Sequence, residues 1–204
     1  MRADFSNIPT PGEMAAPVNV LSLRNGRRGG LSGGRRVDSG SLWSNWQLRG
    51  TWTVPSGGNQ PPSNVSVTPS SGSGSSQTFA FLYSDPNGFA DLSTTYMLVN
   101  SVLDWPGSCY SYYDRGANAL WLLSDGANFW MGPVTPGSVT SVQNSQCILS
   151  GAGSSVSGSV NNLTVNVALT FKPAFAGAKN VYMNAVDSGS LWSNWQLRGA
   201  WTAP

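Results

Sequence analysis

Hydrophobic and polar residues alternate along several short stretches of this chain of 204 residues. One face of the longest alternation carries Leu163, Val165, Val167, Leu169 and Phe171. A shorter alternation, over residues 77–83, places Phe79, Phe81 and Tyr83 together in the same way. A period of two residues is typical of a β-strand that buries one side. We therefore expect strands over residues 163–171 and 77–83, and we find no 3.6-residue period that would predict a helix.

Turn-forming residues separate these stretches from others of the same kind. Residues 109–113 and 119–123 predict a hairpin, because Arg115-Gly116-Ala117-Asn118 lies between them. Short strands at intervals of about 8–15 residues, with Gly and Pro between them, indicate two packed sheets. The predicted fold class is therefore all-β, an antiparallel β-sandwich.

One stretch of the chain occurs twice. Residues 37–55 read VDSGSLWSNWQLRGTWTVP, and residues 186–204 read VDSGSLWSNWQLRGAWTAP. The copies lie 149 residues apart and differ only at Thr51/Ala200 and Val54/Ala203. Such a near-identity indicates duplication of a structural unit or of its closing segment.

Within the second copy, apolar and polar residues again alternate, which predicts the closing strand of the sandwich. Its apolar side chains would be Trp192, Trp195, Leu197 and Trp201. A ladder of stacked Trp and Arg side chains is the alternative interpretation. The ladder is disfavoured, because residues three apart in a strand point to opposite faces. In the first copy, we expect another subunit to cover the corresponding residues, Trp43, Trp46, Leu48, Arg49 and Trp52.

Composition divides the chain into four parts. Residues 1–36 form a Gly/Arg-rich arm with six arginines against two acidic residues, and residues 37–55 are the first copy. Residues 56–64 read as a linker and 65–204 as the sandwich. The arm could contact an acidic surface, although a flexible charged arm explains the same composition. The remainder has no basic stripe and no long apolar run, so we expect neither nucleic-acid binding nor membrane insertion.

Charged residues make up only 10% of the chain, and there are 9 tryptophans. This composition suits an extracellular or cell-surface all-β protein better than a cytosolic one. In that setting, the two cysteines, Cys109 and Cys147, predict a disulfide. The alternative is a pair of buried free thiols.

Residues suited to catalysis or metal binding are few. The chain has no His, which removes the commonest general base, so we predict no enzymatic activity. Paired carboxylates for glycosidic chemistry could come from Asp104, Asp114 and Asp125, but their places near strand ends suit turns. Asp85, Asn87 and Asp91 resemble part of a calcium loop but offer too few oxygens, and an Asx turn explains them. No metal site and no cofactor are predicted.

Aromatic residues gather in one window, over residues 105–130. Strands that bury one face would leave part of this set exposed, with Asn and Asp nearby. We regard Tyr112, Trp121 and Trp130 as candidates for binding a glycan, and a protein contact is the alternative.

The chain also resembles a known family. The segments that carry the resemblance are SVTPSSGSGSSQTFAFLYSDPNG, CYSYYDR, GPVTPGS, LTFKPAFAGAKNVYMNAVD and WQLRGAWT. They are similar to Ig-like repeat domains of long secreted bacterial surface proteins, over residues 63–204 and separately over 37–55. The resemblance implies an Ig-like fold and an extracellular setting, and it supplies no catalytic residue.

Two functions follow as expectations. The first is a structural subunit that inserts its 37–55 segment into a neighbour and so assembles with itself into an open filament or surface array. Residues 37–55 could equally be the tail of an upstream repeat in a tandem array. The second function is a carbohydrate-binding or adhesin module that takes a polysaccharide partner.

Overall fold

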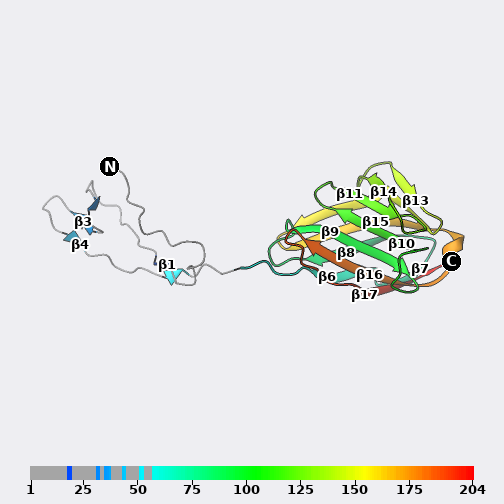
Figure 1. Cartoon of the computed structure of the whole chain (residues 1–204), viewed down its shortest axis with the longest axis horizontal. Helices are drawn as coiled ribbons and strands as arrows, with labels where there is room; N and C mark the ends of the chain where they lie inside the picture. Colours follow the sequence, from blue (N-terminus) through cyan, green and yellow to red (C-terminus); the bar gives the residue numbers. More distant parts are fainter. Residues whose placement is uncertain (1–17, 20–30, 33–34, 38–42, 45–50, 53–56) are drawn as a thin grey trace. The chain divides into compact units, whose positions relative to one another are not determined.

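The computed structural model describes residues 57–204 in full and, before them, the backbone of five short strands (Figure 1). The chain divides into two compact units, Met1–Gly58 and Asn59–Pro204. In the first unit, β1 pairs with β5, and β3 lies between β2 and β4. The bounds of these strands are β1 Val18–Asn19, β2 Leu31–Ser32, β3 Arg35–Val37, β4 Trp43–Ser44 and β5 Thr51–Trp52.

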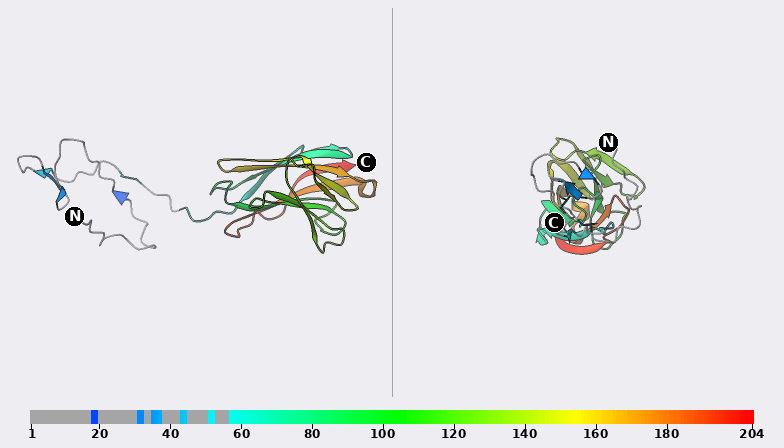
Figure 2. Two further views of the ribbon diagram at one scale, coloured as in Figure 1. Left: turned by 90° about the horizontal axis from the view of Figure 1, so that it is seen from above. Right: turned by 90° about the vertical axis from the view of Figure 1, so that its left-hand side faces the viewer.

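The second unit consists of two β-sheets packed face to face (Figure 2). The five-stranded sheet has the order β13-β14-β15-β8-β6. Its strands are β6 Ser63–Thr68, β8 Ser76–Ser84, β13 Ser141–Gln143, β14 Cys147–Ser159 and β15 Asn162–Phe171. β6 thus begins within the predicted linker. A single 3-10 turn, η1 (Pro173–Phe175), follows β15.

The second sheet has seven strands in the order β12-β11-β10-β9-β16-β17-β7. They are β7 Ser71–Ser73, β9 Leu92–Asn100, β10 Cys109–Asp114, β11 Ala119–Leu123, β12 Trp130–Val134, β16 Gly177–Asp187 and β17 Gln196–Ala203. The pairs are antiparallel except β7 with β17, which is parallel. The prediction of an all-β sandwich is confirmed, and the hairpin predicted around residue 116 is β10–β11.

The two predicted alternations form the centre of the core. β8 and β15 pair side by side, with Phe81 opposite Val165 and Tyr83 opposite Leu163. These side chains are buried between the sheets, together with Met97 of β9 from the seven-stranded sheet. Burying apolar surface stabilises the folded state by roughly 25 cal/mol per Å². The face of each strand that carries the apolar residues of the alternation therefore turns inward.

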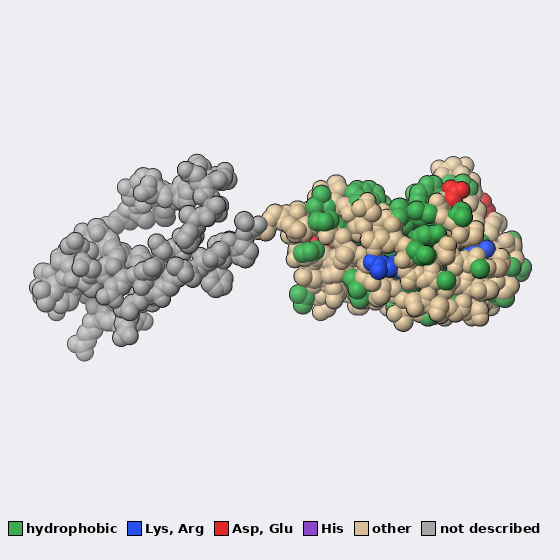
Figure 3. All heavy atoms as spheres, turned by 90° about the horizontal axis from the view of Figure 1, so that it is seen from below, with side chains coloured by type: hydrophobic (Ala, Val, Ile, Leu, Met, Phe, Trp, Pro, Cys, Tyr) green, Lys and Arg blue, Asp and Glu red, His purple; other side chains and the backbone are tan. Residues whose placement is uncertain are grey.

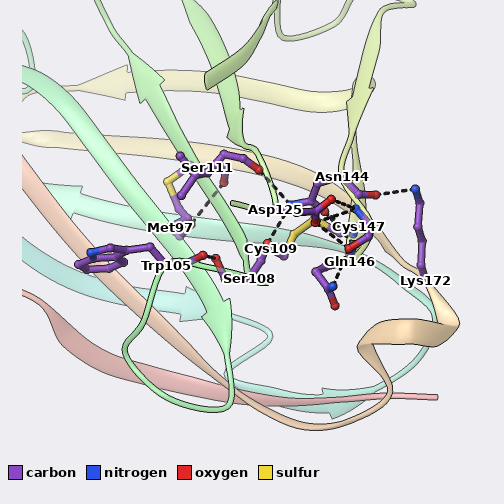
Figure 4. Close-up of a disulfide and its surroundings, with 12 residues drawn as sticks. Met97, Trp105, Ser108, Cys109, Ser111, Asp125, Asn144, Gln146, Cys147 and Lys172 are labelled. Atoms are coloured by element: carbon purple, nitrogen blue, oxygen red, sulfur yellow. Dashed lines mark hydrogen bonds between the residues drawn. A yellow bond between two sulfur atoms is a disulfide. The ribbon is translucent and has the colours of Figure 1, made fainter. Parts of the chain in front are cut away.

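A disulfide joins the two sheets, as the sequence predicts. Cys109 is the first residue of β10 and Cys147 the first of β14, with Cα atoms 5.8 Å apart. The buried side chain of Asn144 lies beside the disulfide (Figure 4). Its Nδ2 donates to the carbonyl oxygens of Ser108 and Leu123, and its Oδ1 accepts from the amides of Gln146 and Cys147. This side chain therefore satisfies backbone groups of both sheets where the disulfide crosses.

The chain enters the second unit at one end of the sandwich and reaches Pro204 at the opposite end (Figures 1 and 2). Asn59 lies at the entry end, where its Nδ2 donates to Oδ2 of Asp187, the last residue of β16. The loop between β8 and β9 lies at the same end, because the amide of Ser188 donates to the carbonyl of Asp91.

Candidate ligand-binding face

The two outer faces of the sandwich carry different kinds of side chain. On β15, the outward positions hold Asn162, Thr164, Asn166, Ala168 and Thr170. On the seven-stranded sheet, the outward positions include Tyr96, Tyr110, Tyr112, Trp121 and Trp130. Outward positions of antiparallel sheets are usually polar. A concentration of exposed aromatic surface on one face indicates a binding site.

Eight rings make up this surface, which we call the aromatic face: Tyr96, Trp105, Tyr110, Tyr112, Trp121, Trp130, Trp192 and Trp195. Tyr96 is central, and the centroids of four other rings lie 5.9–6.2 Å from its own. Trp192 stacks parallel to it, with 8° between the ring planes. Trp105 and Trp130 extend the surface through Tyr110, at 5.2 and 5.0 Å. The rings therefore form one continuous surface rather than isolated contacts.

The three residues predicted to bind a glycan come together in this face. Tyr112, Trp121 and Trp130 lie on the adjacent strands β10, β11 and β12. The Tyr112 ring meets Trp130 edge to face at 4.5 Å and lies parallel to Trp121 at 6.1 Å. The part that the sequence did not predict is the contribution of β9 and the second copy. Tyr96 lies opposite Tyr112, on the neighbouring strand β9. Trp192 and Trp195 reach the face because β16 pairs with β9 across a long stretch of chain, which no local spacing reveals.

The second copy departs from its predicted alternation at a β-bulge. Gly199 lies opposite Val181 of β16, but Leu197 lies opposite Tyr182, so Arg198 is the extra residue. Because one extra residue reverses the side-chain parity, Leu197 is 57% exposed whereas Trp201 is 5% exposed. The prediction of one shared apolar face for the closing strand is therefore wrong. Trp192 and Trp195 precede β17 and belong to the aromatic face.

Trp201 is the residue of the second copy that closes the core. Its ring meets Phe79 edge to face at 5.2 Å, and its Nε1 donates to the carbonyl oxygen of Gly74 at 2.9 Å. A Cβ atom on Gly72 would lie 2.4 Å from the ring, so a glycine is required there. β17 also pairs on both sides, with β16 and β7. We call the space bounded by Gly72, Gly74 and Phe79 the Trp201 socket.

The first copy repeats one feature of the second in its backbone. In β3 and β4, Val37 pairs with Trp43. In the second copy, the corresponding residues, Val186 and Trp192, form a bridge. Trp46, Leu48 and Arg49 lie outside the described residues, and of Trp43 and Trp52 only the backbone is described. The subunit contact expected at these residues stays a prediction.

The aromatic face carries little charge. Desolvation raises the pKa of Tyr96, Tyr110 and Tyr112 above its usual value, and the neighbouring Asp114 acts in the same direction on Tyr112. The hydroxyl groups therefore stay protonated at neutral pH. Figure 3 shows a side of this unit on which hydrophobic side chains lie among polar groups, with only isolated charges. Because its rings are uncharged, the aromatic face suits a neutral ligand better than a charged one.

The aspartates considered for catalysis accept hydrogen bonds from loop groups, locally for Asp104 and Asp114 and between two loops for Asp125. Asp104 accepts from the amide of Trp105, Asp114 from that of Ala117, and Asp125 from that of Ser145. Asp85 likewise forms the expected Asx turn, accepting from the amide of Asn87 at 2.8 Å. Asn87 itself turns away and accepts from the amide of Gln60. A third carboxylate that the sequence did not associate with this loop, Asp187, lies beside Asp85 and Asp91.

No protein-family model, curated protein or solved structure matched the chain. In the described part of the chain, no helix has the length and hydropathy needed to cross a bilayer.

Proposed function

We propose that residues 59–204 form a polysaccharide-binding module of an extracellular surface protein, with the aromatic face as its binding surface. The observation that carries the proposal is the contrast between the two outer faces. Outward positions of the five-stranded sheet hold Ser, Thr and Asn together with aliphatic residues such as Ala80 and Leu82, whereas those of the seven-stranded sheet gather Tyr and Trp. The disulfide is in keeping with an oxidising compartment.

The chemistry of a sugar fits this surface. The C–H groups of a pyranose ring form an apolar face that packs on an aromatic ring, and its hydroxyl groups need hydrogen-bonding partners at the edges. Trp192 is 50% exposed and Trp105 is 37% exposed, so both present ring surface to solvent. Asp104, which accepts from the Trp105 amide, and the tyrosine hydroxyl groups of the aromatic face supply polar groups next to these rings. A row of rings also suits a polymer better than a single sugar.

Replacing Trp192 by alanine should weaken binding to neutral polysaccharides about tenfold, equivalent to about 1.4 kcal/mol. Trp130→Ala should have a similar effect, because its ring joins Tyr110 and Tyr112. The measurement is a pull-down of the full chain with insoluble polysaccharides, followed by titration with soluble fragments. Phe129→Ala is the matched control, since Phe129 is 58% exposed and lies next to Trp130 but outside the aromatic face. Failure of the wild-type chain to bind any polysaccharide tested, or equal losses in the control, would contradict the proposal.

Assembly through the first copy is a second candidate function. It is favoured because the first copy has the same residues as the second copy at the positions that fit the Trp201 socket. Gly50 and Trp52 correspond to Gly199 and Trp201. A Cβ atom on Gly199 would lie 2.7 Å from the carbonyl oxygen of Ser70, so this glycine is needed for the strand to fit. The two positions at which the copies differ are, however, buried to different extents in the second copy. Thr51 corresponds to the exposed Ala200, whereas Val54 corresponds to Ala203, which is 2% exposed.

Strand exchange between identical chains would place Val54 in the space of Ala203. Two additional methyl groups in a packed core cost about 1–3 kcal/mol. If exchange occurs, Val54→Ala should therefore strengthen self-association by about one order of magnitude or more, whereas Thr51→Ala should leave it unchanged. Sedimentation velocity over a range of concentrations measures both. A chain that stays monomeric in all three forms would remove the assembly candidate and leave residues 37–55 as the closing segment of another repeat.

A further inference from the structure

Three aspartates from two distant parts of the chain meet at the end of the sandwich where the chain enters. Asp85 and Asp91 lie in the loop between β8 and β9, and Asp187 is the last residue of β16. One carboxylate oxygen from each lies within 4.8 Å of those of the other two. Asp85 is completely buried and Asp187 is 2% exposed. Two of the three carboxylates are thus removed from the water that would otherwise solvate their charge.

The hydrogen bonds at this cluster leave one buried oxygen without a partner. Asp187 accepts from the Leu191 amide and from Asn59, each at 2.8 Å, and Asp91 accepts from the Ser188 hydroxyl. Asp85 uses Oδ1 for the Asn87 amide, but its Oδ2 has no hydrogen-bond partner in the protein. Leaving a buried acceptor unpaired costs about 1–3 kcal/mol, and more for a charged group. The buried, unpaired oxygen beside two other carboxylates makes this cluster a candidate ligand site.

The electrostatics of the cluster indicate that a ligand bound here carries positive charge. Burial raises the pKa of Asp85, and the nearby Asp91 and Asp187 raise it further. The donors that contact the three carboxylates are amides and a hydroxyl group, which carry no positive charge. Like charges held this close are stable only if one takes up a proton or a cation lies between them. A proton would serve one pair of oxygens, whereas a cation satisfies all three groups.

We propose that Asp85, Asp91 and Asp187 bind one Ca²⁺ ion. Calcium takes oxygen ligands at about 2.3–2.6 Å, so oxygens that lie within 4.8 Å of one another are close enough to contact a single ion. Carboxylates are hard ligands that select Ca²⁺ or Mg²⁺ over softer metals. Three protein carboxylates leave further positions for water, as is common for weak extracellular sites.

Calcium at this position would add a further link among three segments that already share hydrogen bonds. It would join the β8–β9 loop to the end of β16, and Asn59 would connect both to the segment that leads into β6. Asp187 belongs to the second copy, and the first copy has Asp38 at the same position. The carboxylate that completes the site is therefore part of the repeated sequence.

The test compares unfolding of the full chain in 10 mM CaCl₂, in 10 mM MgCl₂ and in EDTA. With a dissociation constant of about 0.1–1 mM, typical of extracellular modules, Ca²⁺ should shift the folding equilibrium about 10- to 100-fold and raise Tm. Terbium luminescence excited through tryptophan, with Ca²⁺ as competitor, measures binding directly. Asp85→Asn should weaken Ca²⁺ binding at least tenfold and abolish the Tm shift. Asp114→Asn is the matched control and should retain both.

Two outcomes would overturn the proposal. One is an equal Tm in Ca²⁺ and EDTA together with no competable terbium signal. The other is an Asp85→Asn chain that is more stable than the wild type in EDTA and binds Ca²⁺ equally well. That second result would identify a cluster relieved by protonation of Asp85, with the ion bound elsewhere.

Discussion

Trp201→Ala should lower the free energy of unfolding by about 3–5 kcal/mol, the usual cost of truncating a buried tryptophan. The ring fills the space beside Phe79 and over Gly72, so its removal leaves a cavity at the edge of the core. The carbonyl oxygen of Gly74 also loses its donor. For a unit of this size, the loss corresponds to a fall in Tm on the order of 10 °C. Chemical denaturation followed by tryptophan fluorescence and circular dichroism measures it.

The second copy supplies a control for this substitution. Trp192 lies nine residues earlier, is 50% exposed and contacts the outer face instead of the core. Trp192→Ala should cost less than about 1.5 kcal/mol, because about half of its surface is already in water. Equal losses for the two variants would show that the assignment of Trp201 to the core and Trp192 to the surface is mistaken.

Removing the disulfide should have an effect of comparable size. In the chain-entropy account, closing a loop over a sequence separation of 38 contributes about 4 kcal/mol. We therefore expect Cys109→Ala/Cys147→Ala to unfold at markedly lower denaturant concentration. Alanine is preferred over serine in this test. Both positions are 1% exposed or less, so a serine at either one would bury its hydroxyl group.

Reduction provides the matched comparison for the double variant. The wild-type chain, unfolded and refolded in the presence of a reductant, should approach the stability of the double-alanine variant. The double variant itself should not respond to the reductant. If the double variant keeps the stability of the oxidised wild type, the disulfide contributes nothing, and the connection between the sheets depends on Asn144 and the core alone.

Some of this protein follows from its sequence because the relevant forces act between near neighbours. Alternation along residues 77–83 and 163–171 predicts strands, since each strand has one face to bury. The hairpin of β10 and β11 follows from turn residues between two apolar runs. The disulfide follows from two cysteines in a chain whose composition suits an oxidising compartment. Tyr112, Trp121 and Trp130 could be grouped because they lie on strands that are adjacent in sequence.

Other features depend on contacts between segments far apart in the chain, and only the tertiary structure decides them. A bulge at Arg198 sends Leu197 outward and Trp201 inward, because the extra residue is defined by the pairing with β16 and not by the sequence of β17 itself. Tyr96 meets Trp192 because β9 and β16 pair. Asp187 meets Asp85 and Asp91 for the same reason. The sequence determined the fold class and which residues carry aromatic rings and carboxylates, whereas long-range strand pairing decided which of those residues share a surface.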